Sequence, residues 1–595
     1  MNEPTFADKF VEFLVEQGYT HCFFVAGGAI MHLVNAVRTR MGCIPVVHEA
    51  SAVIAAEYFN EVSPGKKAFA LVTSGPGLTN ALTGIAGAFL ESREVLIVGG
   101  QVKSSDLSRG EVRQRGIQEI DGVSMAAPVC VRAQRLEAAV DFTTLSGLVF
   151  QGRDTRPGPV YLEICLDAQG ERTTLGSTDY LFPSESSDLE NESERAAHQI
   201  IAVLRESRRP ILLIGGGVSF ADSQGILCPL ASAGIPTMTT WNGFDRIPDD
   251  HPSFAGRPNT WGQRSANLLI SQSDCVVAIG TRLGLQQTGF NWEEWGPRAG
   301  EGVVVQVDID ERELQKGHPR VDFLLRADAN RVLRHIVEAD FPDYSDWWSH
   351  VRKVRQLVPT IDPENSRRDG YLSPYELVEQ LSRKMSELDV LVPASSGSGQ
   401  FVPMMTFVSK SGQRIVTNKG LASMGYGLPA AFGAALGSGK RVVLVEGDGS
   451  FSQSIQELGS IAVHQLPLKI FLLDNDGYGS IRTTQKNYFG GAYLGCDRQT
   501  GLGFPDWRKL ATAFDIPAVQ LDPDGLESSD AARLFDSPGP AMFVVPVDPA
   551  QTYFPKVASK ITADGGMVSE PIHRMYPPLS DEIERQIQIE PIREL

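Results

Sequence analysis

The sequence lacks paired cysteines and long hydrophobic runs. Its seven cysteines, at positions 22, 43, 130, 165, 228, 275 and 496, are scattered and form no Cys-x-x-Cys pair. This pattern argues against a zinc site and a disulfide framework, and it predicts a reducing, cytoplasmic setting. No uninterrupted apolar stretch reaches the roughly 18 residues that a membrane-spanning helix needs. The first residues lack a basic segment followed by an apolar one, so we expect no signal peptide.

An excess of positive charge is also missing. The formal net charge is −18 at pH 7, and Lys and Arg form no block that would offset it. A nucleic-acid partner is therefore not expected. Apolar residues make up 42% and charged residues 21% of the chain, as in ordinary globular proteins, and its 595 residues predict on the order of three or four domains.

What the chain does contain is a repeated alternation of apolar strands and amphipathic helices. This alternation predicts the α/β class, with three Rossmann-like, doubly wound parallel sheets that are covered by helices on both faces. We expect domains at 1–170, 195–342 and 371–550, and a C-terminal tail at 551–595. Polar stretches around 170–194 and 359–370 are interpreted as linkers. The sequence leaves open whether the tail is extended or docked on a neighbouring part.

One strand–turn–helix–strand segment carries polar oxygen ligands at both strand ends. The apolar run 442–445 leads into Gly447-Asp448-Gly449-Ser450, and the run 468–473 leads to Asn475, 27 positions after Asp448. In a parallel βαβ unit, both side chains would lie at the carboxyl edge of neighbouring strands, where open α/β sheets bind ligands. A carboxylate, an amide oxygen and a loop carbonyl suit a hard cation such as Mg²⁺ that also holds a diphosphate. A simple turn is the alternative interpretation of this glycine-rich segment.

A second candidate is Glu49, which follows the apolar run 44–47 at a predicted strand-to-helix junction. Spacing alone favours a structural role, in which Glu49 is a charge in the first turn of a helix and interacts favourably with the helix dipole.

The Gly-Asp-Gly-Ser segment with its later Asn-Asp-Gly resembles the thiamine-diphosphate motif of the acetolactate synthase and pyruvate decarboxylase superfamily. The resemblance implies that Asp448 and Asn475 bind Mg²⁺ through their side chains and Gly477 through its carbonyl. It also implies that Gly449 and Ser450 contact the diphosphate of the cofactor.

Several segments of the first block are similar to motifs of acetolactate synthases. They are Val25 to Ala29, His48-Glu49, Thr73 to Gly77, Gly100 to Val102, Gln118-Glu119 and Pro157 to Val160. The resemblance implies that Glu49 hydrogen-bonds N1′ of the aminopyrimidine and so promotes loss of the C2 proton, that Gln118 is catalytic, and that Gly27 and Gly28 contact the cofactor. Two positions depart from the family pattern: Val25-Ala26 replaces Tyr-Pro, and Ile117 replaces Phe.

The third block extends the similarity. Gly397-Ser398-Gly399-Gln400 resembles the Gly-Val-Gly-Gln diphosphate loop, and 420–431 resembles Gly-Leu-Gly-Thr-Met-Gly-Tyr-Gly-Leu-Pro-Ala-Ala. By this resemblance Ser398, Gly399, Gln400 and Ile481 contact the cofactor, the Ala422 carbonyl accepts from the aminopyrimidine, and Met424 bends the cofactor; core filling is the alternative for Met424. Ala29, Ile117, Thr484 and Gln485 are expected to line the substrate pocket. Thr484 stands where the family carries Trp, which suggests a roomier acceptor site.

The middle block leaves FAD binding open. Gly215-Gly216-Gly217 follows a predicted strand, but three consecutive glycines do not make a Gly-x-Gly-x-x-Gly motif. Asp308 ends another predicted strand and could accept a hydrogen bond from a ribose hydroxyl, and Arg282 matches the arginine near the flavin of acetolactate synthases.

The resemblance implies a thiamine-diphosphate- and Mg²⁺-dependent lyase or ligase of C–C bonds. Such an enzyme would decarboxylate pyruvate or a similar 2-oxo acid and transfer the acyl-anion equivalent to a carbonyl acceptor, with a keto-sugar as one option. The alternatives are acetolactate synthase proper, a C–C hydrolase of a cyclic diketone, a non-oxidative decarboxylase and a catalytically silent binding protein. The partners are expected to be small molecules and further copies of the chain, in a homodimer or homotetramer whose sites lie between subunits.

Overall fold

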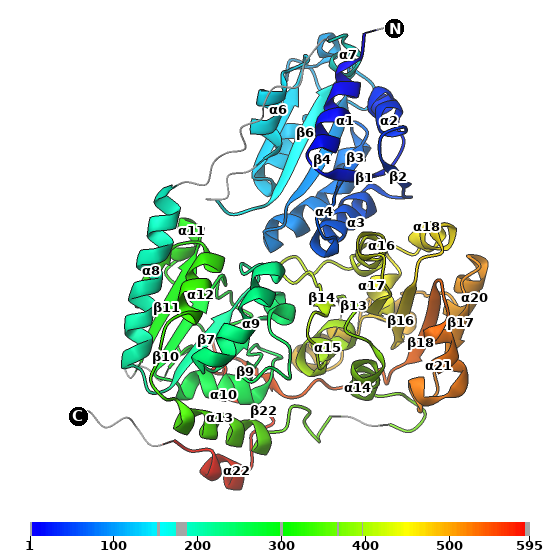
Figure 1. Ribbon diagram of the computed structural model, residues 1–595. Coiled ribbons are helices and arrows are strands. Elements are labelled where there is room, and N and C mark those ends of the chain that lie inside the picture. Colours follow the sequence, from blue (N-terminus) through cyan, green and yellow to red (C-terminus); the bar gives the residue numbers. More distant parts are fainter. Residues whose placement is uncertain are drawn as a thin grey trace.

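The computed structural model describes residues 3–150, 155–173, 187–297, 302–365, 368–395 and 397–589. These ranges form three six-stranded sheets, each enclosed by helices, that lie in three lobes of the molecule (Figure 1). Every strand pair within the three sheets is parallel. The predicted α/β class with three doubly wound parallel sheets is confirmed. No helix in the described ranges is both long and apolar enough to cross a membrane.

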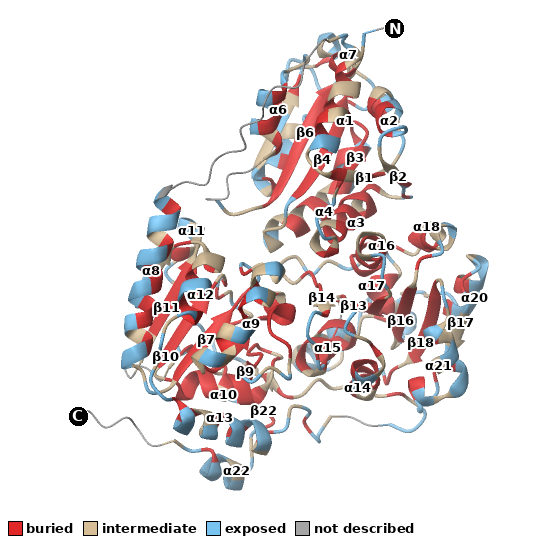
Figure 2. Cartoon of the chain, in the orientation of Figure 1, coloured by how far each residue is buried: buried red, intermediate tan, exposed pale blue. Residues whose placement is uncertain are grey.

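The first unit is built on a sheet of strand order β2-β1-β3-β4-β6-β5. Its strands are β1 (Tyr19–Phe24), β2 (Gly42–Pro45), β3 (Lys67–Val72), β4 (Val95–Gln101), β5 (Arg132–Leu136) and β6 (Pro159–Cys165). Its helices are α1 (Phe6–Glu16), α2 (Met31–Val37), α3 (Glu49–Val62), α4 (Pro76–Glu91), α5 (Gly122–Ala126), α6 (Phe142–Val149) and α7 (Leu166–Gly170). The central strands β3 and β4 are buried almost throughout, as expected of strands with helices on both faces (Figure 2).

The central unit has the strand order β12-β11-β10-β7-β8-β9. Its strands are β7 (Pro210–Ile214), β8 (Thr237–Thr239), β9 (Phe254–Gly256), β10 (Cys275–Ile279), β11 (Val303–Asp308) and β12 (Phe323–Arg326). Its helices are α8 (Ser187–Glu206), α9 (Phe220–Ala233), α10 (Arg264–Gln272), α11 (Glu311–Leu314), α12 (Ala329–Val337) and α13 (Ser345–Leu357).

The third unit has the strand order β14-β13-β15-β16-β18-β17. Its strands are β13 (Val390–Pro393), β14 (Arg414–Ile415), β15 (Val442–Gly447), β16 (Leu468–Asp474), β17 (Ala518–Gln520) and β18 (Ala541–Pro546). Its helices are α14 (Pro374–Lys384), α15 (Val402–Thr406), α16 (Gly427–Ser438), α17 (Asp448–Phe451), α18 (Glu457–His464), α19 (Gly479–Phe489), α20 (Trp507–Ala513) and α21 (Ser529–Asp536).

The predicted linker at 170–194 is partly wrong. Residues 174–186 lie outside the described residues, but α8 already begins at Ser187. Further along this helix, Ala197, Ile200 and Leu204 are buried in the core of the central unit, while its charged residues face solvent. The many charges at the start of α8 made an amphipathic helix look like a polar connection. The stretch 359–370 is irregular where it is described.

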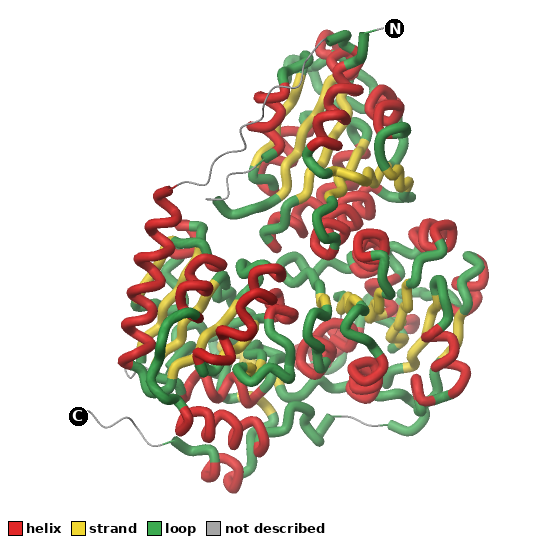
Figure 3. The backbone as a smooth tube through the Cα atoms, viewed as in Figure 1, coloured by secondary structure: helices red, strands yellow, loops and turns green. Residues whose placement is uncertain are grey.

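The first and third units are joined by close packing of α3 against α16 (Figures 1 and 3). Small residues on α16 make this approach possible. A Cβ atom at Gly433 would lie 2.1 Å from the carbonyl oxygen of Ala55, and one at Gly437 would lie 2.7 Å from that of Phe59. Both distances are far below van der Waals contact, so these positions require glycine.

The tail is docked rather than free. It contains β19 (Lys556–Val557), β20 (Ser559–Ile561), β21 (Met567–Ser569), β22 (Met575–Tyr576) and α22 (Asp581–Gln586), and it returns to the central unit. Ile572, Met575 and Ile587 are buried in the hydrophobic core of that unit. Arg264 of α10 donates to the carbonyl oxygen of Pro577 at 2.7 Å. The question that the sequence left open is therefore settled in favour of docking.

Candidate active site

The candidate cation site lies where β15 and β16 end. These strands are neighbours in the third sheet, with Gly447 in register with Leu473. Asp448 opens α17 directly after β15, and Asn475 follows the last residue of β16. The topology thus brings the two side chains to one sheet edge, as their spacing predicts.

Oxygen atoms from three residues converge at this edge. The end of the Asn475 side-chain amide lies 2.7 Å from the Gly477 carbonyl oxygen and 3.3 Å from Oδ1 of Asp448. With nitrogen at that end, the amide donates hydrogen bonds to both oxygens. With oxygen there, three oxygens face one another, an arrangement that a cation between them would stabilise. The residues present therefore fit a hard cation.

The protein environment of Asp448 also suits a cation. Its carboxylate is 1% exposed and accepts from the N–H groups of Gly449 at 2.7 Å and Gly477 at 2.9 Å. Burial, together with the nearby Asp474 carboxyl, raises the pKa of Asp448. A buried carboxylate is costly unless it is paired, and a bound cation would supply the missing charge. The described residues hold no group of three or more His, Cys, Asp or Glu side chains placed for a metal, so a cation here would depend on the amide and carbonyl oxygens.

The turn that presents Gly477 requires glycine. Its φ is +129°, and a Cβ atom would lie 2.1 Å from the carbonyl oxygen of Cys496. The carbonyl is held at the strand edge by this tight packing.

The predicted diphosphate loop is buried near the same edge. Ser398 and Gln400 are each 2% exposed. The Ser398 hydroxyl is 2.6 Å from the hydroxyl of Tyr553, and Gln400 donates to Thr417 at 2.8 Å. Gly399 lies between them in the turn 397–401. These contacts tie the loop to Tyr553 and Thr417.

Ser450 and the segment 422–425 are further parts of the predicted cofactor site. The Ser450 hydroxyl donates to Glu446 at 2.6 Å and accepts from the Gly425 N–H at 3.1 Å. Ala422 has a φ of +49°, and its carbonyl accepts from the Ser395 hydroxyl at 3.3 Å. Its neighbour Met424 is 40% exposed, so the structure does not support core filling for this side chain.

Glu49 is the first residue of α3, as the predicted strand-to-helix junction requires. Its side chain is largely buried, with the whole residue 8% exposed. The Asn80 amide of α4 donates to Oε2 of Glu49 at 2.9 Å, which is the one hydrogen bond to this carboxylate from the described residues. The second oxygen is left for another donor. No hydrogen bond or ion pair among the described residues joins Glu49 to Asp448, Asn475 or Gly477 within the chain.

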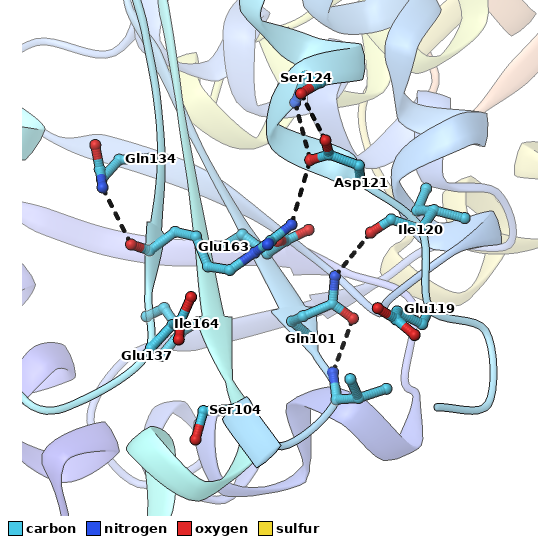
Figure 4. A network of polar contacts seen from close by, with 12 residues as sticks. Gln101, Ser104, Glu119, Ile120, Asp121, Ser124, Gln134, Glu137, Glu163 and Ile164 are labelled. Atoms are coloured by element: carbon cyan, nitrogen blue, oxygen red, sulfur yellow. Dashed lines mark hydrogen bonds and ion pairs between the residues drawn. The ribbon is translucent and has the colours of Figure 1, made fainter. Parts of the chain in front are cut away.

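Gln118 lies on an exposed loop with a φ of +60°. The loop is anchored from β4, where the Gln101 amide donates to the Ile120 carbonyl at 3.0 Å (Figure 4). Glu119 accepts from backbone N–H groups of the same loop, including that of Arg115 at 2.8 Å, and these bonds lower its pKa to about 2 despite burial. Ile117 is 88% exposed, so the described residues leave it almost uncovered.

The remaining predicted cofactor-binding residues, Gly27, Gly28 and Ile481, and the pocket residue Ala29 differ in their contacts within the chain. Gly27 packs so closely against Thr73 that a Cβ atom would lie 2.4 Å away, whereas Gly28 is exposed. Ala29 accepts from Gln169 at 2.8 Å through its carbonyl. On α19, Ile481 is 46% exposed.

Two further residues of α19 belong to the predicted substrate pocket. The Thr484 hydroxyl donates to the Ser480 carbonyl at 3.1 Å. The Gln485 amide is engaged by both polar groups of the Leu494 backbone, at 3.1 and 3.0 Å, so it holds a loop in this structure.

A cavity of about 1770 Å³ adjoins the central unit. Its lining includes four of the five residues considered for FAD: Gly216, Gly217, Arg282 and Asp308. Gly215 packs closely against Gly280: a Cβ atom added at Gly215 would lie 2.2 Å from the Gly280 carbonyl oxygen. Burial raises the pKa of Asp308 to about 6.

Lys419 connects this cavity to the diphosphate loop. Its ammonium lies 4.7 Å from the ring centroid of Trp241 and 4.6 Å from that of Phe401, and it donates to Oε1 of Gln400 at 3.2 Å. Removal from water lowers its pKa to about 7. The indole N–H of Trp241, which also lines the cavity, has no hydrogen-bond partner among the described residues.

Comparison with known proteins matches all three units. Profiles of the thiamine pyrophosphate enzymes cover residues 4–125 (N-terminal TPP binding domain), 197–336 (central domain) and 397–545 (C-terminal TPP binding domain). The acetolactate synthase isozyme 2 large subunit of Escherichia coli is 30% identical, with 92% of this chain and 96% of the relative covered. The chain belongs to the thiamine pyrophosphate enzyme family.

Other relatives agree. The acetolactate synthase large subunit of Pyropia yezoensis is 29% identical, covering 94% of both chains, and that of Lactococcus lactis is 27% identical, covering 95% of this chain and 96% of the relative. This family member is therefore an acetolactate synthase-like enzyme that uses thiamine pyrophosphate, which is thiamine diphosphate.

Some residues around the site were not found from the sequence. Asn80, Tyr553 and Lys419 contact predicted site residues from distant positions, and Glu457 contacts the backbone before Glu49. They carry no local signal, because their significance depends on tertiary neighbours.

Proposed function

We propose that this enzyme uses thiamine diphosphate and Mg²⁺ to cleave and form C–C bonds. In this proposal it decarboxylates pyruvate or a similar 2-oxo acid and transfers the acyl-anion equivalent to a carbonyl acceptor. The observation that supports it best is the meeting of Asp448, Asn475 and Gly477 at one strand edge. We also propose that the protein is cytoplasmic. We further propose that the chain consists of domains at 1–170, 195–342 and 371–550 and a C-terminal tail at 551–595.

In the proposed site, Asp448, Asn475 and the Gly477 carbonyl hold Mg²⁺. Gly449, Ser450, Ser398, Gly399 and Gln400 hold the diphosphate, and Ala422, Met424, Ile481, Gly27 and Gly28 contact the rest of the cofactor. Thiamine diphosphate, when bound, would supply the carbon nucleophile for reaction with the 2-oxo acid. Oε1 of Glu49, which has no hydrogen-bond partner among the described residues, would hold a proton at N1′ of the aminopyrimidine, while Asn80 holds the carboxylate in place through Oε2. A carboxylate held in this way in a partly dry site interacts with that proton far more strongly than it would in water.

The site is proposed to be completed by a second copy of the chain. Met424, Ile481 and Ile117 are 40%, 46% and 88% exposed, although each belongs to the proposed cofactor or substrate surface. A homodimer, or a homotetramer built from it, would cover them by placing the first unit of one subunit against the third unit of another.

For the acceptor we propose a carbonyl compound larger than a second pyruvate, with a keto-sugar as the class to test. Thr484 is exposed and smaller than the Trp of the family pattern, which supports a roomier pocket. Acetolactate synthase proper, a cyclic-diketone hydrolase and a non-oxidative decarboxylase remain the competing activities.

The experiment that tests the activity is CO₂ release from pyruvate, with and without added aldehydes or keto-sugars. Release that depends on the acceptor supports ligation to that acceptor. Release with pyruvate alone, together with acetolactate in a colour assay, identifies acetolactate synthase proper, whereas release without any ligated product identifies simple decarboxylation. If thiamine diphosphate and Mg²⁺ have no effect on any of these reactions, the proposal is wrong.

We further propose that the cavity of the central unit binds a nucleotide, with FAD as the first occupant to test. Its size, the glycine loop at Gly216 and Gly217, and Asp308 support a nucleotide. A flavin absorption band in the purified protein would identify FAD, and a colourless protein that binds no added flavin would exclude it.

A further inference from the structure

Glu457 is a buried carboxylate of the third unit that reaches into the first. It is the first residue of α18, and it is 0% exposed. Its Oε1 accepts from the backbone N–H groups of Val47 and His48, both at 3.2 Å. These N–H groups lie 410 and 409 positions away in the sequence, immediately before Glu49.

Two hydroxyl groups also form hydrogen bonds with this carboxylate. The Ser460 hydroxyl donates to Oε2 at 2.9 Å, and Ser51 of α3 hydrogen-bonds to the same carboxylate. Burial raises the pKa of Glu457, while these hydroxyl and N–H donors lower it. No Lys or Arg of the described residues forms an ion pair with it. Burying a carboxylate without a cation costs free energy, so the hydrogen bonds that Glu457 accepts must offset that cost.

The contacts fix the entry into α3. The N-terminal N–H groups of a helix have no partners within the helix, and an acidic group near them is favourable. His48 caps α3 itself, because its Nδ1 accepts from Ala50 at 3.3 Å. Glu457 holds the two preceding peptide groups from outside, and Asn80 holds the Glu49 carboxylate from α4. The backbone that leads into Glu49 and the Glu49 side chain are therefore held by two different elements, α18 and α4.

We propose that Glu457 is a positioning residue for Glu49, which it orients by anchoring the Val47 and His48 peptide groups. The inference rests on the proposed role of Glu49. In this arrangement Glu457 contacts neither substrate nor cofactor; it limits how far the Glu49 carboxylate can drift from N1′ of the aminopyrimidine. Small displacements of a catalytic group lower rates strongly, so the effect is expected on proton removal from the cofactor and not on cofactor affinity.

The test measures the exchange of the C2 proton of enzyme-bound thiamine diphosphate for deuterium, by rapid quenching and NMR. It compares wild type, Glu49→Gln, Glu457→Leu, which removes the acceptor of both N–H groups, and the exposed control Val463→Ala on the same helix. Glu457→Leu is expected to slow exchange about 10-fold or more with less than about a twofold change in the Kd for the cofactor. Val463→Ala should exchange like wild type. Exchange by Glu457→Leu at the rate of Val463→Ala, or a rate loss that follows entirely from weaker cofactor binding, would overturn the inference.

The same experiment separates this inference from the proposed function. If wild type does not accelerate exchange over free cofactor, or Glu49→Gln exchanges as fast as wild type, the role of Glu49 is wrong and Glu457 has nothing to position. If Glu457→Leu does not fold, Ser460→Ala takes its place, since it removes one donor to the carboxylate. That variant is expected to slow exchange about two- to threefold, and an unchanged rate would overturn the inference.

Discussion

The side-chain amide of Asn80 donates a 2.9 Å hydrogen bond to Oε2 of Glu49. Asn80→Ala should therefore slow exchange of the cofactor C2 proton by about 10- to 100-fold, which corresponds to the loss of a hydrogen bond to a charged group. Cofactor affinity should change little. Thr79→Ala is the matched control, because the Pro76 carbonyl is the one acceptor of the Thr79 hydroxyl among the described residues. Equal exchange rates in the two variants would contradict the positioning of Glu49 by Asn80.

Removal of the metal should abolish cofactor binding. Chelation with EDTA is expected to release thiamine diphosphate, and added Mg²⁺ should restore binding, since the cation links the protein oxygens to the diphosphate. Asp448→Asn should weaken Mg²⁺-dependent binding by at least about 100-fold. Asp476→Asn serves as the control: Asp476 is exposed with a φ of +59°, a conformation that Asn tolerates. Titration calorimetry of the cofactor at several Mg²⁺ concentrations measures both effects, and full affinity in the presence of EDTA would be the contrary result.

Sites shared between subunits predict complementation. Glu49→Gln and Asp448→Asn should each be inactive alone, yet co-expressed subunits should recover about one quarter of wild-type activity. Half of randomly mixed dimers are mixed, and each mixed dimer holds one intact site of two. If each site were contained within one chain, mixing would restore nothing.

The α3–α16 contact should tolerate no added side chain at Gly433. Gly433→Ala places a Cβ atom 2.1 Å from the Ala55 carbonyl oxygen and is expected to cost about 1–3 kcal/mol in the free energy of unfolding. Gly225→Ala in α9 is the control, since nothing lies within 4 Å of an added Cβ, and it should be neutral or stabilising by up to about 1 kcal/mol. Urea unfolding of both variants measures the difference. If Gly433→Ala were as stable as Gly225→Ala, α3 and α16 would have to move apart at little cost in free energy.

The lowered pKa of Lys419 predicts that the stability of the fold depends on pH. Removal from water lowers its pKa from 10.5 to about 7. Between these values the unfolded chain binds more protons than the folded one, so this residue makes stability rise with pH. The cost of ionising the folded lysine is fully present below about pH 7 and fades as the pH rises toward 10.5.

Lys419→Met should therefore raise Tm at pH 6 by about 2 °C or more, and the gain should shrink by pH 9.5. Lys440→Met, at an exposed lysine that lines the same cavity, should show no such trend. A gain that grows with pH would have the wrong sign for this explanation.

The sequence predicted the sheets well because parallel strands that are buried on both faces appear as continuous apolar runs. The predicted run 442–445 lies within β15 (Val442–Gly447), and the predicted run 468–473 lies within β16 (Leu468–Asp474). The same logic placed Asp448 and Asn475 at one edge, because a βαβ unit fixes where its strand ends lie. It failed at α8, whose first turns carry so many charges that their buried stripe was hidden.

The contacts around Glu49 could not be predicted from spacing. Glu457 approaches Val47 across 410 positions, and nothing in either segment indicates the other. The lowered pKa of Lys419 likewise depends on its burial, in which Trp241 and Phe401 take part from other positions in the chain. Local patterns specify elements and their ends, whereas the surroundings of a charge are decided by which elements the fold brings together.

The docking of the tail has a consequence for synthesis of the chain. The core of the central unit includes Val557, Ile572 and Met575, yet its last helix from the main segment ends at Leu357. About 200 further residues, including the whole third unit, must leave the ribosome before these side chains exist, a delay of roughly 10–40 s at bacterial to eukaryotic elongation rates. During that interval the nascent central unit exposes apolar surface, so we expect it to be the part of the newborn chain that most needs a chaperone.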